Sequence, residues 1–321
     1  MRLLVIKPSS LGDIVHAMVV VSELKRQRPK VVVDWVARDC FAELVRASQI
    51  AQRVLIYERR GGLLSFFRLL SLIRQETYDC VFDMQGLARS GIMTLFARSP
   101  RKIGRKDARE LSCLAYTETV PYPGAVHAID ILKEFLTTVD CSNEVSGIVT
   151  EFEHVTSPKY TEFLKEQIPQ KPFICLFPES RVPEKEWRHF SKLAELLLIS
   201  EPNINLLILG SPSHLRFHCE NPRLFDFRGQ TSLTDAVFLI RNASLVIAND
   251  SGPMHISAAQ GRPTLGLFTI TDPLRFGPYP VYRKSNVALR LENKAYEAEL
   301  VAHTAVEMLN DFAWNDRNFS L

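Results

Sequence analysis

The chain has 321 residues, of which 46% are hydrophobic and 23% charged, with a formal net charge of +3. These values are typical of an ordinary globular chain with room for two domains, and they exclude a disordered or low-complexity chain. Because the net charge is so small, the composition gives no ground for nucleic-acid binding.

The cysteines and the apolar runs indicate the cellular compartment and whether the chain could span a membrane. The six cysteines are Cys40, Cys80, Cys113, Cys141, Cys175 and Cys219. They are scattered without a Cys-x-x-Cys pair, so we expect reduced thiols of a cytoplasmic protein, with no disulfide framework and no zinc site. No apolar run reaches the roughly 18 residues that a membrane-spanning helix requires, which leaves attachment to a membrane surface open.

Short apolar runs alternate with helical patterns in the first half of the chain. We expect strands at residues 3–6, 31–36, 54–57 and 78–83, helices at 14–28, 41–47, 63–75, 127–138 and 156–167, and an edge strand with linker at 144–153. This alternation predicts a parallel sheet with crossover helices, whose ligands gather at the carboxyl ends of the strands. The loop at 8–13 lies in that position.

The same rhythm restarts after a proline-rich segment at 169–172. We expect strands at 173–177, 204–209, 245–248 and 263–268, helices at 187–200 and 231–242, and a last helix at 295–312. The sequence therefore predicts two facing Rossmann-like α/β domains with a central cleft, at residues 1–168 and 169–321. We expect a hinge near 169–172 and the last helix packing back on the N-terminal domain.

The loop at 8–13 carries Asp13 beside Gly12 at an expected helix start. Two interpretations stay open for Asp13. It is an ordinary helix N-cap, or it is a carboxylate at the cleft rim that accepts a proton from an attacking hydroxyl. In either case the helix dipole favours its ionised form.

A second polar turn follows the strand expected at 245–248. Pro253 suits the first helical position, and Gly252 allows the backbone to come close to a ligand. The free N–H groups and the helix dipole predict a phosphate site, unless Asp250 or Ser251 simply caps the helix. The imidazole of His255 lies in the same turn.

The loop at 178–187 supplies cations to the same half of the chain. Arg181 and Lys185 would reach phosphates bound at the Gly252 turn, where a cation can neutralise a departing diphosphate. Lys185 alone is also consistent with a plain surface position. No Asp-x-Asp pair accompanies it, so we expect no metal ion.

A basic run follows the segment at 84–90 in the first domain. It consists of Arg98, Arg101, Lys102, Arg105, Lys106 and Arg109, opposed only by Asp107. The run is either a solvated loop or a pocket for an anionic ligand. We favour the pocket, because the arginines fall in expected loops after strands and not along one exposed helix face.

Four segments, in this order, resemble those of the bacterial lipopolysaccharide heptosyltransferases, family 9 of the inverting glycosyltransferases. They are KPSSLGDIVH at 7–16, DMQGLARS at 83–90, EKEW at 184–187, and NDSGPMH at 249–255 with GRP at 261–263 and TDP at 271–273. Arg59-Arg60 and Asp107–Glu110 look most like heptosyltransferase I, which adds the first heptose to the Kdo sugar of the inner core. The resemblance implies the GT-B fold of two facing Rossmann-like domains.

The resemblance also implies a reaction and its site. L-glycero-D-manno-heptose would pass from ADP-heptose to Kdo on lipid A, with inversion and without metal or cofactor. Asp13 would be the catalytic base, and Lys185 would neutralise the departing diphosphate. The implied donor-binding residues are Gly12, Arg181, Lys185, Asp250, Ser251, Gly252 and His255. The implied acceptor-binding residues are Ser10, Arg59, Arg60, Gln85, Arg89 and Arg109.

Such an enzyme would be cytoplasmic and peripheral at the cytoplasmic face of the inner membrane, with no nucleic-acid partner. One segment departs from the family, since the turn at 210–215 reads GSPSHL without the acidic residue that contacts the donor ribose. A later heptosyltransferase, or one acting on another surface glycan, is therefore an alternative. Further alternatives are a GT-B nucleotide-sugar epimerase of the UDP-N-acetylglucosamine type and a non-catalytic glycan-binding module.

Overall fold

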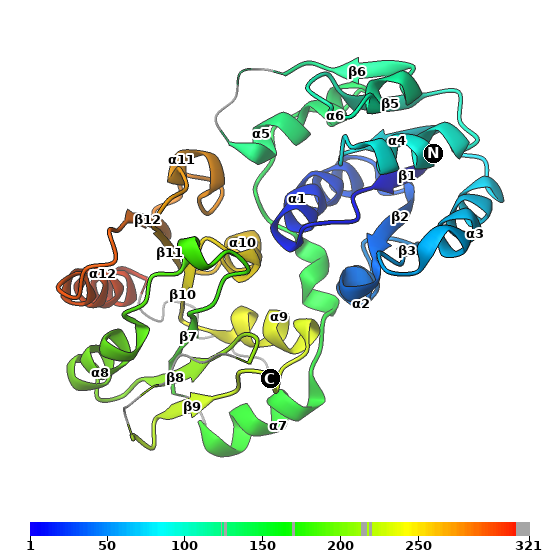
Figure 1. Cartoon of the computed structure of the whole chain (residues 1–321). Helices are drawn as coiled ribbons and strands as arrows, with labels where there is room; N and C mark the ends of the chain where they lie inside the picture. The colour runs from blue at the N-terminus through cyan, green and yellow to red at the C-terminus, as the bar shows by residue number, and fades with distance from the viewer. Residues whose placement is uncertain (123, 125–126, 169–170, 213–216, 218–219, 313–321) are drawn as a thin grey trace. The chain divides into compact units, whose positions relative to one another are not determined.

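The structure is a computed structural model that describes residues 1–122, 124, 127–168, 171–212, 217 and 220–312 (Figure 1). The chain forms two compact units, Met1–Val155 and Thr156–Leu321. Each unit is built around one parallel sheet, as the alternating pattern predicts. Among the helices of the described residues, none combines the length and the apolar character needed to span a bilayer.

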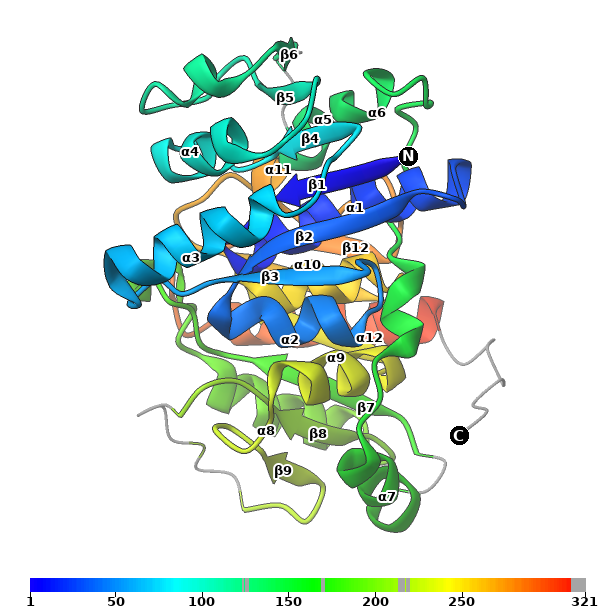
Figure 2. The same ribbon diagram turned by 90° about the vertical axis from the view of Figure 1, so that its right-hand side faces the viewer.

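The first unit contains a six-stranded sheet in the order β3-β2-β1-β4-β5-β6. Its strands are β1 (Arg2–Ile6), β2 (Val32–Arg38), β3 (Arg53–Tyr57), β4 (Cys80–Asp83), β5 (Lys102–Arg105) and β6 (Glu118–Val120). Its helices are α1 (Leu11–Gln27), α2 (Asp39–Ala47), α3 (Gly62–Arg74), α4 (Ala88–Phe96), α5 (Ala128–Leu132) and α6 (Glu134–Thr137), with 3-10 turns η1 (Ser112–Ala115) and η2 (Thr150–His154). Helices α3 and α4 contribute to one core on the same face of the sheet (Figure 2).

The second unit repeats this strand order, with a six-stranded sheet in the order β12-β11-β10-β7-β8-β9. Its strands are β7 (Phe173–Phe177), β8 (Asn205–Ile208), β9 (Leu224–Asp226), β10 (Leu245–Asn249), β11 (Thr264–Phe268) and β12 (Asn286–Arg290). Its helices are α7 (Pro158–Gln167), α8 (Phe190–Ser200), α9 (Leu233–Asn242), α10 (Gly252–Ala259), α11 (Pro273–Phe276) and α12 (Glu297–Asp311), with the 3-10 turn η3 (Pro183–Lys185).

The strand order reverses direction once in each sheet, between β1 and β4 and between β7 and β10. Ile6 pairs with Asp83 at the first reversal, and Phe177 pairs with Ala248 at the second. The loops that follow these paired ends therefore start side by side. In open α/β sheets, ligands bind at this switch point, outside the carboxyl ends of the strands.

The structure confirms the four strands predicted at the switch points, β1, β4, β7 and β10. These strands are buried on both faces, which explains why their sequences are continuous apolar runs. The sequence analysis does not predict strands β5, β6, β9 and β12. Each of them is short or only partly buried, so it gives no continuous apolar run. The edge strand expected at 144–153 is wrong, and that segment ends in the turn η2. Strand β5 also shows that part of the basic run is sheet and not loop.

The two units divide between Val155 and Thr156, which is earlier than the expected boundary at 168–169. Helix α7 belongs to the second unit because it packs against α9, and Ser157 Oγ donates to Asp235 Oδ1 at 2.6 Å. Residues 169–170 of the expected hinge lie outside the described residues.

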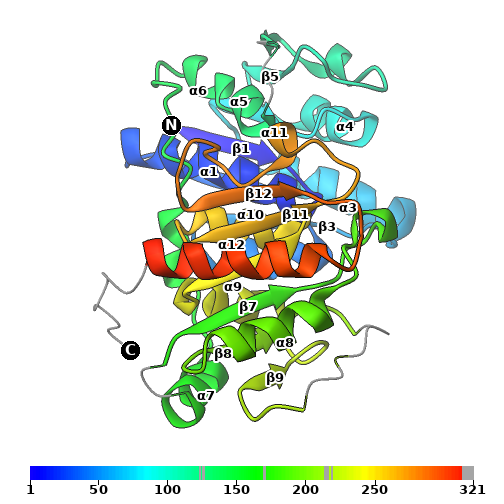
Figure 3. The same ribbon diagram turned by 90° about the vertical axis from the view of Figure 1, so that its left-hand side faces the viewer.

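The last helix belongs to the core of the second unit. Its apolar side chains, including Val301 and Ala305, are buried in the second core, where α12 packs against α8 (Figure 3). Residues Glu297–Asp311 therefore contribute to the core of the second unit, and the expected packing of this helix on the N-terminal domain stays a prediction.

A buried carboxylate fixes the start of α12. Glu297 is 5% exposed, and its Oε2 accepts a hydrogen bond from Trp187 Nε1 at 3.0 Å. The same carboxylate accepts the backbone N–H groups of Glu292 and Lys294. Glu297 thus joins the last helix to the loop that follows β7.

We expect Glu297→Leu to lower the free energy of unfolding by roughly 2–4 kcal/mol, because it leaves an indole N–H and two backbone N–H groups without their acceptor. Chemical denaturation of the full chain measures this change. Glu299→Leu, on the exposed face of the same helix, is the matched control and should change stability by no more than about 0.5 kcal/mol. Equal effects of the two substitutions would contradict the assignment.

Candidate active site

The first switch point carries Asp13 on the opening turn of α1. Helix α1 begins at Leu11 with Ser10 as its N-cap, so Asp13 is the third helical residue and not the N-cap itself. Asp13 Oδ2 accepts hydrogen bonds from Ser10 N at 3.0 Å and from Ser10 Oγ at 2.7 Å. The side chain of Asp13 is still 46% exposed, so it remains accessible to a ligand.

The buried side chain of Lys7 lies close to the Asp13 carboxylate. The Lys7 side chain is 4% exposed, and its Nζ lies 3.7 Å from Asp13 Oδ1. Burial lowers the pKa of Lys7, while the nearby Asp13 carboxylate opposes that change. Burial also disfavours the charged form of Asp13, but Lys7 and the Ser10 hydrogen bonds prevail and hold the pKa of Asp13 well below its usual range. Asp13 is therefore a carboxylate at neutral pH.

The loop after β4 is tied to the loop after β1. Lys7 Nζ donates to the Met84 carbonyl at 2.9 Å, and Gln85 Oε1 accepts the Ser9 N–H at 3.4 Å. Asp83, at the end of β4, accepts the N–H groups of Gln85 and Gly86 at 3.0 Å each. The structure thus brings Ser10, Gly12, Asp13 and Gln85 into one neighbourhood.

The predicted acceptor arginines follow strands β3, β4 and β5 of the first sheet, on loops or on the first turn of a helix. Arg59 and Arg60 are exposed in the turn between β3 and α3. Arg89, on the first turn of α4, donates to Tyr57 Oη at 2.7 Å, at the end of β3. Arg109 is exposed, and its backbone N–H donates to the Gly86 carbonyl at 2.9 Å.

The basic run does not form the single anion pocket that its sequence favours. Arg101 makes a bidentate pair with Glu118, with both distances 2.8 Å. Arg105 pairs with Asp107, and Lys102 Nζ donates to the Leu95 carbonyl at the end of α4. These cations stabilise the β5–β6 edge of the sheet.

The second switch point carries Asp250 and Lys185. Asp250 follows β10 and is 6% exposed, and its Oδ2 lies 2.6 Å from Lys185 Nζ. Thr271 Oγ1 donates to the same oxygen at 2.7 Å. Because Lys185 comes from the turn η3 in the loop after β7, this ion pair joins the loops of the two strands at the reversal.

Helix α10 begins at Gly252, two residues after Asp250. Ser251 is its N-cap, and Pro253 is the second helical residue, one position later than expected. Ser251 Oγ is buried and has no hydrogen-bond partner among the described residues, and it makes no capping bond. Asp250 is engaged by Lys185 and Thr271. The simple helix-cap interpretation of these two side chains is therefore not what the structure shows.

The loop after β7 is held by Asn249. Its Nδ2 donates to the Pro178 carbonyl at 2.6 Å, and its Oδ1 accepts the Trp187 N–H at 3.0 Å. Arg181 is exposed on this loop, and His255 is buried on α10 with 8% exposure. The structure thus groups Lys185, Asp250, Ser251 and Gly252 closely, with Arg181 on the same loop as Lys185.

Lys7, Asn249 and Thr271 hold the loops of the candidate site in place, and the sequence analysis does not identify them. Each belongs to a segment that resembles the family, but the partner that gives the side chain its role is distant in sequence. Residues 213–215 of the turn that departs from the family lie outside the described part of the chain, as does Cys219.

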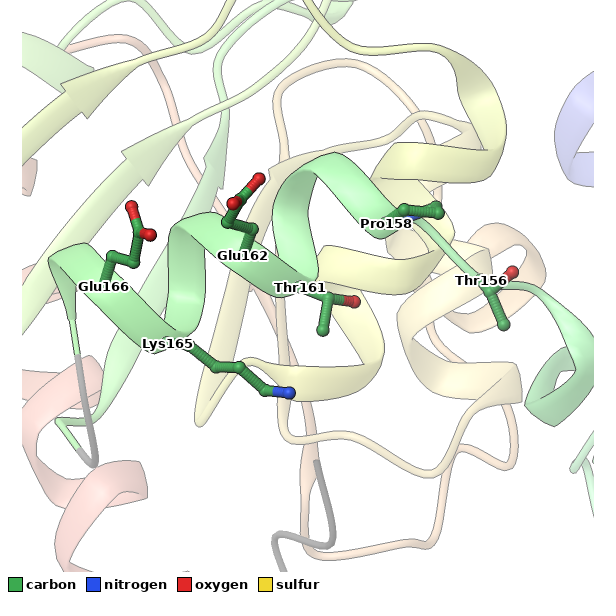
Figure 4. A pocket seen from close by; sticks show the side chains of 6 residues that line it. All are labelled: Thr156, Pro158, Thr161, Glu162, Lys165 and Glu166. Carbon is green, nitrogen blue, oxygen red and sulfur yellow. The ribbon is translucent and has the colours of Figure 1, made fainter.

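Two other features bear on the location of the site. In the ranges that the structure describes, no three His, Cys, Asp or Glu side chains are arranged to hold a metal ion. A shallow, open hollow runs along α7 (Figure 4). There Glu162 and Glu166 point to one side of the helix, whereas Thr161 and Lys165 point to the other, so their polar groups do not converge.

We expect Lys7→Met to raise the pKa of Asp13 toward the ordinary range of an aspartate, because the variant removes the nearest positive charge. Carbon-13 NMR titration of the Asp13 carboxyl measures this change directly. Lys30→Met, at an exposed position after α1, is the control and should leave the Asp13 titration unchanged. An unchanged pKa in Lys7→Met would show that the Ser10 hydrogen bonds alone keep Asp13 ionised.

Comparison with known proteins agrees with this arrangement. The family model described as "Glycosyltransferase family 9 (heptosyltransferase)" matches residues 66–306. The lipopolysaccharide core heptosyltransferase OpsX of Haemophilus influenzae is 26% identical over 86% of this chain and 81% of its own length. Lipopolysaccharide heptosyltransferase 1 of Escherichia coli K12 is 24% identical over 87% of this chain and 91% of its own.

A solved structure described as E. coli heptosyltransferase WaaC with ADP has a TM-score of 0.81 at 22% identity, covering 98% of this chain and all of that one. This likeness confirms the GT-B fold, with its two Rossmann-like domains. The family model covers well over half of the sequence, and the chain belongs to glycosyltransferase family 9, the heptosyltransferases.

Proposed function

We propose that the chain transfers L-glycero-D-manno-heptose from ADP-heptose to a Kdo sugar carried on lipid A, with inversion and without a metal ion. The observation that carries the proposal is the half-exposed, ionised Asp13 carboxylate at a switch point of a family 9 glycosyltransferase. The named relatives are lipopolysaccharide heptosyltransferases, and one similar structure is described with ADP, which supports the acceptor class and the nucleotide.

The donor diphosphate is proposed to bind at the start of α10. Ser251 Oγ and the first N–H groups of the helix supply hydrogen-bond donors, and the helix dipole favours an anion there. Lys185 is close enough to Asp250 for the diphosphate and the carboxylate to share its charge. Asp250 would accept hydrogen bonds from heptose hydroxyls. Arg181 and His255 complete the part of the proposed donor site that the second unit supplies.

Asp13 is the proposed general base. An acceptor hydroxyl attacks the anomeric carbon as the bond from that carbon to the diphosphate oxygen breaks, and the electron pair leaves with ADP. Asp13 takes the hydroxyl proton, and Lys185 neutralises the charge on the leaving group. A carboxylate with a low pKa is a weak base, so the transfer of the proton must come late, when the attacking oxygen has become acidic.

The acceptor is proposed to bind at the exposed arginines of the first unit. Arg59, Arg60, Arg89 and Arg109 would pair with the Kdo carboxylate and the lipid A phosphates. Ser10 and Gln85, next to Asp13, would orient the attacking hydroxyl. With such a lipid-linked acceptor, the enzyme would work in the cytoplasm as a peripheral protein at the inner-membrane surface.

A donor screen separates this proposal from its alternatives. The protein is mixed with delipidated acceptor and either ADP-heptose or UDP-N-acetylglucosamine, and the products are identified by mass spectrometry, with and without EDTA. Heptosylated acceptor from ADP-heptose in both conditions supports the proposal. Epimerised UDP-sugar would indicate the epimerase, and binding without any product would indicate a glycan-binding module.

We expect Asp13→Asn to lower kcat by roughly 10²–10⁴-fold, which is the usual contribution of a general base, and to leave the affinity for ADP-heptose almost unchanged. Steady-state kinetics and calorimetric donor titration measure the two effects. Asp39→Asn, on the first turn of the neighbouring helix α2, is the matched control and should retain full activity. A comparable loss of donor affinity in Asp13→Asn would move Asp13 from the base to the donor site.

We expect the double variant Arg59→Ala/Arg60→Ala to raise the apparent KM for the lipid-linked acceptor roughly tenfold or more, because it removes two cations from the acceptor phosphates. The KM for ADP-heptose should stay the same. Lys30→Ala/Arg46→Ala removes two exposed cations from other parts of the unit and serves as the control. If the donor constant rises instead, these arginines belong to the donor site.

A further inference from the structure

Positive charge is concentrated in one part of the first unit. The segment from Arg59 to Leu114 has 11 lysines and arginines against five acidic residues, although the whole chain has a net charge of only +3. Arg59, Arg60, Arg68 and Arg74 are exposed on and before α3. Clustered cations of this kind attract an extended anionic surface more effectively than a single small anion.

The same segment exposes large apolar side chains. Leu63, Leu64 and Phe67, on the first two turns of α3, are 75%, 84% and 59% exposed. Leu111 and Leu114, in and beside η1, are 76% and 79% exposed. We call these five residues the apolar rim. Such a concentration of exposed apolar side chains on a globular chain usually marks an interaction surface.

The elements that carry the apolar rim adjoin one another. Helix α3 contacts α4, and α4 contacts η1. Ile92 and Leu95, on the outer face of α4, are also exposed, at 41% and 58%. Figure 2 shows α3 and α4 as the layer that covers one face of the first sheet. The rim is therefore part of a layered surface and not a set of isolated side chains.

The rim side chains of α3 lie outside the core of the first unit. The opposite face of this helix already packs on the sheet through Leu69, Leu70 and Ile73. Leu64 and Phe67 project from the outer face, where Arg68 accompanies them. A helix that combines an outward apolar group with flanking arginines is typical of proteins that lie on an anionic membrane surface.

We propose that the apolar rim docks the first unit on the surface of an anionic lipid bilayer. Leu63, Leu64 and Phe67 enter the interfacial layer, while Arg68 and Arg74 pair with lipid phosphates. This inference rests on the proposed function for its biological purpose. Arg59 and Arg60, which are proposed to bind the lipid-linked acceptor, directly precede the apolar rim in the sequence. Docking of the rim would therefore hold them at the level of the lipid headgroups.

Co-sedimentation of the full chain with vesicles tests the proposal. We expect binding to vesicles that contain phosphatidylglycerol, weaker binding at high salt, and little binding to pure phosphatidylcholine. Leu64→Ser/Phe67→Ser should reduce the partition coefficient on phosphatidylglycerol vesicles on the order of tenfold or more. Ile199→Ser/Tyr282→Ser is the matched control, because these second-unit side chains are 79% and 82% exposed. Circular dichroism of each variant establishes that it is folded.

Equal vesicle binding by wild type and Leu64→Ser/Phe67→Ser would overturn the proposal. So would a wild-type dimer that this variant converts to a monomer without any vesicle binding, since the rim would then be an interface with a second copy. Activity on a short, soluble Kdo acceptor separates the two proposals. Normal transfer by the variant that has lost vesicle binding supports docking, whereas vesicle binding by a wild type that transfers no heptose would defeat only the proposed function.

Discussion

One type of hydrogen bond closes both switch points, and the arrangement of both sites depends on it. In each unit a polar side chain at the end of one central strand donates to the carbonyl that follows the neighbouring central strand. Lys7 Nζ reaches Met84 O in the first unit, and Asn249 Nδ2 reaches Pro178 O in the second. Each bond ties together the two loops at the point where the strand order reverses.

The side chains that donate these two hydrogen bonds, Lys7 and Asn249, differ in charge, and this difference affects the electrostatics of each site. Lys7 brings a buried cation that keeps Asp13 ionised from behind, and its position is fixed within the fold. Asn249 is neutral, so Asp250 takes its cation from Lys185, which is 24% exposed on the turn η3. A fixed cation suits a residue that must stay ionised, and an accessible cation suits a ligand that must be bound and released.

The sequence indicates the architecture well at the centre of each sheet and poorly at its edges. Central strands such as β1 and β10 are buried on both faces and therefore read as continuous apolar runs. Strand β5 is short and contains a single large apolar residue, Ile103, and it is stabilised partly by Arg101 and Glu118 beyond its own residues.

The same limit applies to the site. Asp13, Lys185 and Asp250 can be identified because each lies in a recognisable loop or turn. The role of Lys7 cannot, since its partner carbonyl lies 77 residues away, and the ion pair of Lys185 spans 65 residues. Similarly, α7 belongs to the second unit through contacts with α9 that no local pattern reveals. Side-chain partners so distant in sequence become visible only once the strand order is known.

The hydrogen bond between Trp187 and Glu297 joins helix α12 to the loop that carries Lys185, so this helix helps to hold the loop in place. The Trp187 backbone is held by Asn249 and its indole by the first residue of α12. A nonsense mutation anywhere between β12 and α12 would spare every proposed donor and acceptor residue. It would nevertheless remove the acceptor of the Trp187 indole together with the apolar face that packs on α8, so such truncated alleles should behave as loss-of-function alleles.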